Sequence, residues 1–460
     1  MNDRRVLYAA MITSFMTTFM SSALNLSVPS LESSFGVSAA ALSWVVSAYT
    51  ISVAAMSLPF GKIADITSRR SIFLAGITGF GILSVVCIFA WNITAMIVVR
   101  VLMGACGAMI FATNNSILIS YYPPNIRGRL LGLSVAGTYV GLTAGPVVGG
   151  ILNSTLGWRS IFAVSAVVSL AAFLAAFRAV PHDRSSQAPD SDSGSFDTAG
   201  AVLYVAAVAA SLYGMTKLGS SAYATVILIA GLAALAGFFI HESKRESAGR
   251  STVMRVSMFR NSRTFTFSSL AALLNYGATF AISYTISIYL QVILGLPSSR
   301  AGLMLIIMPA TQAALSPLMG SLSDRIRPAV LASSGMGICA VTLLLFSRIG
   351  LTTSTAYVMA VLGLTGFGFA LFSSPNTNAI LSCVDQKDYG VANSIIATMR
   401  TYGQSSGMAV LTMITSIILG QGTLESSPKT DILTMMHIAF IVFACICVVG
   451  LFFSLARDKR

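Results

Sequence analysis

Two arginines lie where a chain of this composition rarely places a charge. Arg100 and Arg400 each fall inside a long apolar run, whereas no Asp or Glu lies near the middle of any such run. A charged side chain near the centre of a bilayer costs about 2.5–3.5 kcal/mol or more, so each guanidinium needs a partner or a water-filled cavity. Arg400 either binds an anionic or polar group of a small molecule, or senses protonation, or it donates to neighbouring helices, for instance around Gln404. All these interpretations stay open.

The apolar runs that carry these arginines set the class of the protein. Of 460 residues, 55% are hydrophobic and 9% are charged, with a mean hydropathy of +0.81. A soluble protein carries about 25% charged residues. Runs of about 20 apolar residues, each long enough to cross a bilayer core as a helix, recur along the chain. The sequence therefore predicts an all-α polytopic membrane protein.

Fourteen membrane spans are expected. They fall near residues 7–29, 41–61, 71–91, 94–119, 131–155, 159–179, 199–216, 222–241, 268–293, 300–320, 328–347, 354–374, 391–419 and 433–455. An even number of spans places both termini on one side of the membrane. The fourteen spans leave only short connections, apart from two polar segments at 181–198 and 242–264.

The basic residues set the orientation. Most Lys and Arg residues lie in alternate short loops, in the segment 242–264 and in the tail 457–460. The other side carries only Arg159, Lys217, Arg300, Arg348 and Lys429. By the positive-inside rule the first side, which holds both termini, is cytoplasmic. The formal net charge of +13 follows this membrane pattern, so we expect no nucleic-acid partner.

An internal repeat divides the chain. Gly61 and Asp65 recur as Gly320 and Asp324, 259 residues later. Three residues of span 4 and the loop after it recur 262 residues later in span 12 and beyond. The pairs are Gly104 with Gly366, Asn114 with Asn376, and Gly128 with Gly390. The repeat shifts the spans by eight and not six, so two additional spans separate two six-span halves. The expected parts are 1–180, the linker 181–198, the additional pair 199–241, the loop 242–264 and 265–460.

The chain lacks the motifs of a membrane-embedded enzyme. The six cysteines have neither metal-ligand spacing nor the pattern of a disulfide framework. We find no His-Glu-x2-His, no Gly-x-Ser-x-Gly and no phosphate-binding loop. We therefore expect no enzyme activity, no metal and no cofactor.

Several segments resemble a known family. The segment 61–70, GKIADITSRR, resembles the loop 2–3 signature of the major facilitator superfamily. The glycines 137, 141, 145 and 149, with Gly150 and Pro146, are similar to the span 5 signature of its antiporters, and Arg100-x3-Gly104-x2-Gly107 is similar to a span 4 signature. Phrases similar to the fourteen-span drug:proton antiporter branch are Trp44-Val45-Val46 with Tyr49, Tyr289-Leu290-Gln291 with Gly295, and Arg400-x2-Gly403-x3-Gly407.

The resemblance implies a major facilitator fold of two six-helix halves plus two additional central helices. It also implies a monomeric transporter in the plasma (inner) membrane that expels drugs or other amphipathic small molecules in exchange for protons. The chain departs from this branch in span 1, where Met20 stands in place of an Asp. This departure bears on the coupling ion and on cationic substrates.

Two sets of residues are expected to govern movement. Gly61, Asp65 and Arg69 are expected to form a conformational latch, because a carboxylate can pair with Arg and with the positive end of a neighbouring helix, which stabilises one of two arrangements of the halves. Asp324 and Arg325 form a weaker second copy. In span 5, Gly141, Gly145 and Gly149 allow close helix packing and Pro146 permits a bend, so this stripe is expected to act as a hinge that shifts as the halves move.

Five residues are expected to contact a substrate. They are Asn25, Arg100, Asn114, Tyr276 and Arg400. Spans 1, 9 and 13 should border the central cavity in this fold, which favours Asn25, Tyr276 and Arg400. The motif of Arg100 is general, so a coupling or structural role is favoured there.

The repeat and the buried polar residues indicate transport, and the resemblance implies its direction and its coupling to protons; two functions are weighed. The first is proton-coupled export of amphipathic small molecules or drugs by alternating access. The second is a carrier of organic anions, lipids or metabolites that uses Arg100 or Arg400, with proton symport as one mode.

Overall fold

The computed structural model describes residues 4–24, 31, 34–35, 39–180, 196–218, 222–419 and 428–457, and most of these residues are helical. No β-strand occurs among these residues, which confirms the predicted all-α class. The helices are α1 (Arg4–Ala23), α3 (Ala39–Ile66), α4 (Arg69–Ile88), α5 (Ile93–Tyr121), α6 (Arg127–Leu156), α7 (Arg159–Ala179), α8 (Thr198–Thr216), α9 (Ala222–Ser247), α10 (Ser257–Asn261), α11 (Arg263–Ile288), α12 (Ser298–Leu305), α13 (Ile307–Ser323), α14 (Pro328–Phe346), α15 (Thr355–Ser382), α16 (Tyr389–Leu419) and α17 (Lys429–Ala456).

Thirteen helical segments of the described chain are long and apolar enough to cross a membrane. The long helix α16 is not among them: it has 31 residues, but Arg400, Gln404 and several Ser and Thr residues lower its hydropathy. At about 1.5 Å per residue it is nevertheless longer than a bilayer core of about 30 Å. The count of fourteen spans therefore stays a prediction that depends on α16. The expected span 300–320 consists of two helices, α12 and α13, which meet at Ile306.

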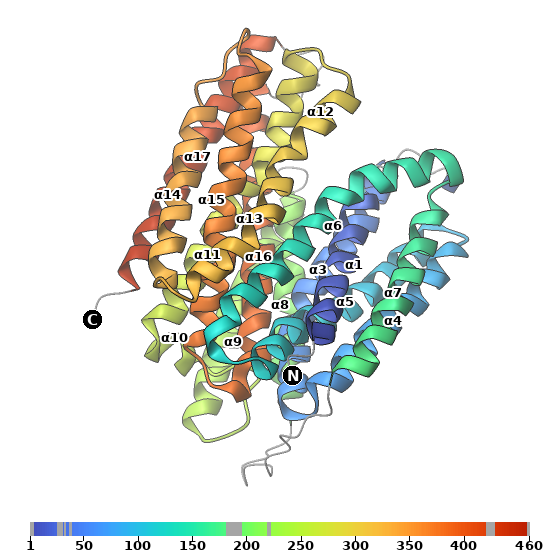
Figure 1. Cartoon of the computed structure of the whole chain (residues 1–460), viewed down its shortest axis with the longest axis vertical. Coiled ribbons are helices and arrows are strands. Elements are labelled where there is room, and N and C mark those ends of the chain that lie inside the picture. The colour runs from blue at the N-terminus through green and yellow to red at the C-terminus, as the bar shows by residue number, and fades with distance from the viewer. Residues whose placement is uncertain are drawn as a thin grey trace.

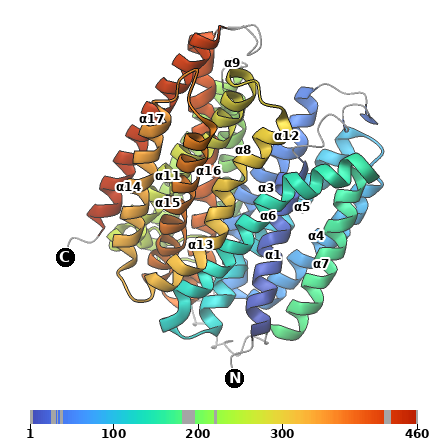
Figure 2. The same cartoon turned by 45° about the horizontal axis from the view of Figure 1, so that its top comes forward.

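The helices form two groups, each with its own core. Helices α1 and α3–α7 pack against one another and are called the first half; α11–α17 form the second half. In Figures 1 and 2 the two groups stand side by side, and their ribbons diverge away from the two chain ends. We call the side of the bundle that holds residues 4 and 457 the terminal side. Contacts between the halves run from α3 and α5 to α16, and from α6 to α13 and α15.

The helices α8 and α9 form a hairpin that touches both halves. Helix α8 packs on α3 of the first half and on α16 of the second. The hydroxyl oxygens of Tyr204 and Thr398 lie 2.9 Å apart, and Ser211 is hydrogen-bonded to Tyr402. On the α3 side, the rings of Tyr213 and Trp44 stack with their centroids 5.1 Å apart. The hairpin therefore lies across the junction of the halves.

The glycine stripe of α6 lies against α1. A Cβ atom added at Gly141 would lie 2.3 Å from Thr18 Oγ1 and 2.6 Å from the carbonyl oxygen of Phe15, both on α1. Gly145 and Gly149 approach α1 in the same way, and α6 continues through Pro146. The stripe thus makes a seam inside the first half. Its expected role as a hinge between moving halves stays a prediction.

We expect Gly141→Ala to destabilise the protein by about 1–3 kcal/mol, because the new methyl group overpacks the α1–α6 seam. The matched control is Gly302→Ala, where a Cβ would meet nothing within 4 Å. Thermal unfolding of the two variants in detergent measures the difference. Equal melting temperatures would show that the seam can open without cost.

Candidate functional site

The two halves are joined on the terminal side by Asp65. This carboxylate, at the end of α3, accepts hydrogen bonds from the backbone N–H groups of Gly390 and Val391, both at 3.0 Å, where α16 begins. Arg69 donates to Asp65 Oδ1 through Nε at 2.9 Å and through Nη2 at 2.8 Å, and it also donates to the carbonyl oxygen of Gln386. The partial positive charge of a helix start and the guanidinium both stabilise the buried carboxylate. These contacts are called the first latch.

Asp324 makes the equivalent contacts at the other junction. Its Oδ1 accepts from Gly128 N–H at 2.6 Å and its Oδ2 from Arg129 N–H at 3.0 Å, where α6 begins. Arg325, expected to be part of this set, is exposed and forms no side-chain hydrogen bond or ion pair with described residues. The second latch is therefore a carboxylate on a helix start that has no guanidinium partner among the described residues. Each copy of the repeated Asp thus accepts two backbone N–H groups from a helix start of the other half, Asp65 from α16 and Asp324 from α6.

Glycine allows this approach at both junctions. A Cβ at Gly61 would lie 2.6 Å from the carbonyl oxygen of Gly390, and one at Gly320 would lie 2.2 Å from that of Gly128. Any side chain at these positions would push the halves apart. Close backbone contact and two carboxylates therefore join the halves on the terminal side.

Arg400 lies between the halves. It projects from α16 in the second half, and its guanidinium carbon is 5.0 Å from the ring centre of Phe111 on α5 in the first half. The side chain is partly exposed, and it forms no hydrogen bond or ion pair with any described residue. A guanidinium stacked on a ring retains its in-plane N–H groups for another partner. This geometry suits an acceptor group of a bound molecule.

An amide pair crosses the same junction as Arg400. Asn115 on α5 donates from Nδ2 to Asn393 Oδ1 on α16 at 2.9 Å, and Asn393 donates to the carbonyl oxygen of Phe111. Neither was among the expected site residues. Asn393 lies seven residues, about two helical turns, before Arg400, and this spacing on one face of span 13 was the available signal.

Tyr276 belongs to an aromatic group that also crosses the junction. Its ring packs edge-on against Phe369 of α15, with centroids 5.2 Å apart, and Phe369 in turn meets Tyr139 of α6 at 6.0 Å. The hydroxyl oxygen of Tyr276 lies 3.3 Å from Ser373 Oγ. Aromatic rings with hydroxyl ends provide an apolar surface with a few polar contacts.

Arg100 lies elsewhere, inside the first half. It is fully buried, its Nε donates to the carbonyl oxygen of Val45 at 2.9 Å, and its guanidinium lies over the ring of Tyr49 at 4.4 Å. Its Nη1 and Nη2 atoms have no hydrogen-bond partner among the described residues. The structure therefore places the two arginines in different surroundings.

Asn114, also expected in the site, lies inside the first half. Its Nδ2 donates to Ser14 Oγ of α1 at 2.8 Å and to Ser134 Oγ of α6 at 3.3 Å. It joins three helices of one half. Asn25 lies outside the described residues.

Comparison with known proteins gives a family match over nearly the whole chain. The family model described as Major Facilitator Superfamily matches residues 10–259 and 268–460. Two solved structures, the human organic anion transporter MFSD10 (TETRAN) and a double Trp mutant of XylE, each superpose with a TM-score of 0.70. The first is 14% identical, with 99% of this chain and 100% of that chain covered; the second is 16% identical, with 99% and 95% covered. At these identities they show the shared fold.

Relatives with named activities are more similar in sequence. The riboflavin transporter RibZ of Clostridioides difficile is 26% identical over 99% of this chain and 98% of its own. The multidrug resistance protein Stp of Mycobacterium tuberculosis is 28% identical over 84% and 71%, respectively. The tetracenomycin C resistance and export protein of Streptomyces glaucescens is 25% identical over 90% and 76%.

We expect Asp65→Asn to open the terminal side, because it removes the charge from hydrogen bonds that contribute about 1.5–3 kcal/mol each. The probe is a thiol introduced by Ser394→Cys in a variant whose six native cysteines are replaced. Ser394 is buried at the junction and donates to the carbonyl oxygen of Ser57 at 2.7 Å. Its alkylation by a water-soluble maleimide should become at least about tenfold faster.

The control for this experiment is Arg325→Ala, which removes an exposed charge from the same side of the bundle without touching either latch. An unchanged alkylation rate in Asp65→Asn would contradict the latch.

Proposed function

The chain belongs to the Major Facilitator Superfamily and is a multi-pass membrane transporter, and from that premise we propose that it exports amphipathic small molecules by alternating access, driven by the proton gradient. The observation that carries the proposal is the pair of latches, each formed by a carboxylate of one half on a helix start of the other. Two such equivalent contacts make a junction that can release and close as a unit.

The proposed orientation places the terminal side in the cytoplasm. The support is the excess of Lys and Arg in the loops of that side, as the positive-inside rule requires. In this orientation both latches close the cytoplasmic side, and the described arrangement is the outward-facing one. Release of both latches, with the halves rocking about the site, would then expose the site to the cytoplasm.

The proposed substrate site is formed by Arg400, Phe111, the Asn115–Asn393 pair and Tyr276. The rings of Phe111 and Tyr276 provide an apolar surface. The guanidinium and the amides place polar groups beside them at the junction of the halves. A site of this composition suits molecules with an apolar body and a polar or acidic end. The names of the relatives, which include a multidrug resistance protein and a tetracenomycin C export protein, support export of such molecules.

Arg400 also favours a second candidate, a carrier of organic anions or of metabolites such as the riboflavin named for RibZ. A partly exposed guanidinium without an acidic partner among the described residues attracts anions and disfavours cations. Proton symport is a mode open to such a carrier.

Coupling to protons is proposed because the chain resembles drug:proton antiporters. The described spans offer no Asp or Glu near their middle, and the position of the branch's span 1 Asp holds Met20, whose sulfur lies 3.1 Å from Ser165 Oγ. The coupling group, if protons are exchanged, therefore differs from the one that this branch uses.

Uptake into proteoliposomes distinguishes the two candidates. Riboflavin, tetracenomycin C and the permanent cation ethidium are supplied outside, under an inside-acid or an outside-acid gradient. We expect the inside-acid gradient to drive uptake of at least one of them, because an antiporter exchanges inner protons for outer substrate. Uptake driven only by the outside-acid gradient would replace the proposal with the symporter. A lack of uptake under both gradients would contradict both.

Arg400→Ala should reduce the affinity for a transported probe about tenfold or more, since a hydrogen bond to a charged group contributes about 1.5–3 kcal/mol. Arg400→Lys should retain part of the affinity, because the charge remains and the planar donor set is lost. Unfolding temperatures establish that both variants are folded, and Arg325→Ala serves as the control for a lost positive charge. Wild-type affinity in Arg400→Ala would remove Arg400 from the site.

A further inference from the structure

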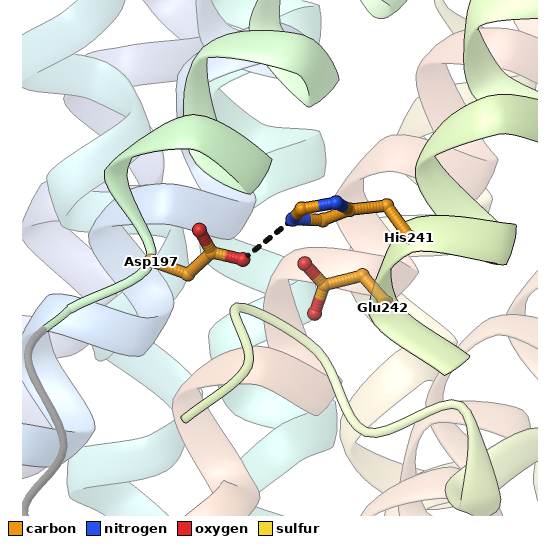
Figure 3. Close-up of side chains that lie close together, drawn as sticks. All are labelled: Asp197, His241 and Glu242. Atoms are coloured by element: carbon orange, nitrogen blue, oxygen red, sulfur yellow. Dashed lines mark hydrogen bonds and ion pairs between the residues drawn. The ribbon is translucent and has the colours of Figure 1, made fainter. Parts of the chain in front are cut away.

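Three side chains with metal-ligating atoms meet away from the proposed substrate site. Asp197 caps the start of α8, and His241 and Glu242 lie near the end of α9, so the two additional helices bring them together (Figure 3). One ligand atom from each lies within 4.8 Å of the other two. Asp197 and His241 are 44 residues apart in the chain, so no short spacing motif announces the cluster.

Each carboxylate is oriented by a backbone N–H group. Asp197 Oδ1 accepts from Gly200 N–H at 3.0 Å, and Glu242 Oε2 accepts from Met254 N–H at 3.0 Å. The other two oxygens, Asp197 Oδ2 and Glu242 Oε1, face the same space. A Cβ at Gly200 would lie 2.6 Å from the first and 2.5 Å from the second, so only glycine leaves this space open.

Glu242 has one carboxylate oxygen, Oε1, without a partner among the described residues. The residue is fully buried (0% exposed), and Oε1 forms no hydrogen bond within the described part of the chain. A buried carboxylate oxygen without a donor or a cation costs several kcal/mol. The Glu242 oxygen is aimed into the space that it shares with Asp197 Oδ2.

Two nitrogen-bearing side chains contact the other carboxylate, that of Asp197. Arg245 Nε lies 2.9 Å and His241 Nε2 lies 3.0 Å from Asp197 Oδ2. Both contacts go to Asp197 Oδ2, and neither reaches Glu242 Oε1. Arg245 Nε also donates to the carbonyl oxygen of Ser251 at 3.0 Å, which gives it a partner if a stronger cation takes its place.

We propose that Asp197, His241 and Glu242 bind a divalent transition-metal ion of the Zn²⁺ type between α8 and α9. One imidazole and two carboxylates are a donor set of this class, whereas Ca²⁺ and Mg²⁺ favour sites made of oxygen alone. The backbone N–H groups on the outer oxygens orient the ligands in the way that supporting hydrogen bonds do in metal sites. Small side-chain rotations would bring the three atoms to metal–ligand distances of about 2.0–2.2 Å.

The ion would connect the additional helices to the second half. Glu242 holds the loop after α9 through Met254, and the neighbouring Arg255 lies 3.7 Å from Asp388, just before the first latch residues Gly390 and Val391. Occupancy would therefore stiffen a loop that leads to the latch. The site and the proposed transport function stand independently, since binding can be measured without a transported substrate.

The test is the thermal unfolding of the purified full-length protein with Zn²⁺, Mn²⁺, Co²⁺ or Ni²⁺ after chelator treatment, together with calorimetric titration of the metal that gives the largest shift. We expect at least one of them to raise the melting temperature, because an ion that binds only the folded state stabilises it. His241→Ala and Glu242→Gln should each weaken the metal affinity at least about tenfold.

Two further variants keep the result interpretable. Glu246→Gln changes a nearby acid that bonds Ser257 outside the cluster and should leave metal affinity unchanged. Arg245→Gln removes the competing cation and should strengthen it. Because about a third of the His241 side chain is exposed, His241→Ala is the variant to rely on if Glu242→Gln does not fold. No shift with any metal, or the same shift in His241→Ala as in the wild type, would overturn the site.

Discussion

The arrangement of the molecule depends on one interaction made twice, a carboxylate at the end of one helix that accepts two backbone N–H groups at the start of a helix in the other half. Between membrane helices there is little hydrophobic driving force, because lipid is as apolar as the helix surfaces. Association therefore requires close packing and polar contacts. Asp65 and Asp324 supply the polar contacts, and the glycines beside them let the backbones approach. Both pairs lie on the terminal side, and the described residues at the other ends of the halves form no equivalent contact.

Much of this arrangement could be predicted from the sequence, because membrane helices are recognised by the length and composition of their apolar runs. The helical class, the repeat that links Asp65 with Asp324, and the two additional helices all rest on local patterns. Contacts that depend on the packing of distant segments could not be predicted. The amide pair Asn115–Asn393 and the cluster of Asp197, His241 and Glu242 arise only when helices remote in the chain lie side by side. Arg325 shows the converse, since a repeat suggested a partner role that its exposed position does not provide.

The two arginines show why residue type and hydropathy do not decide a role. Arg100 and Arg400 have the same sequence signal, a cation within an apolar run. One turns toward Tyr49 inside its own half, and the other crosses to Phe111 of the opposite half and stays partly exposed. The difference lies in which face of the helix carries the residue and in what the fold places opposite that face. The hydropathy of a span shows neither the helix face that carries a residue nor what lies opposite that face.

The α8–α9 hairpin has a geometric consequence for any movement of the halves. It is bonded to α16 through Tyr204 and Ser211 and stacked on α3 through Tyr213, so it spans both bodies along one flank of the molecule. Large separation along that flank would break these contacts, whereas the opposite flank, where α6 meets α13, carries no such brace among the described helices. If the halves rock as proposed, the hairpin would confine the rotation to an axis near itself, and any opening would be wider on the far flank.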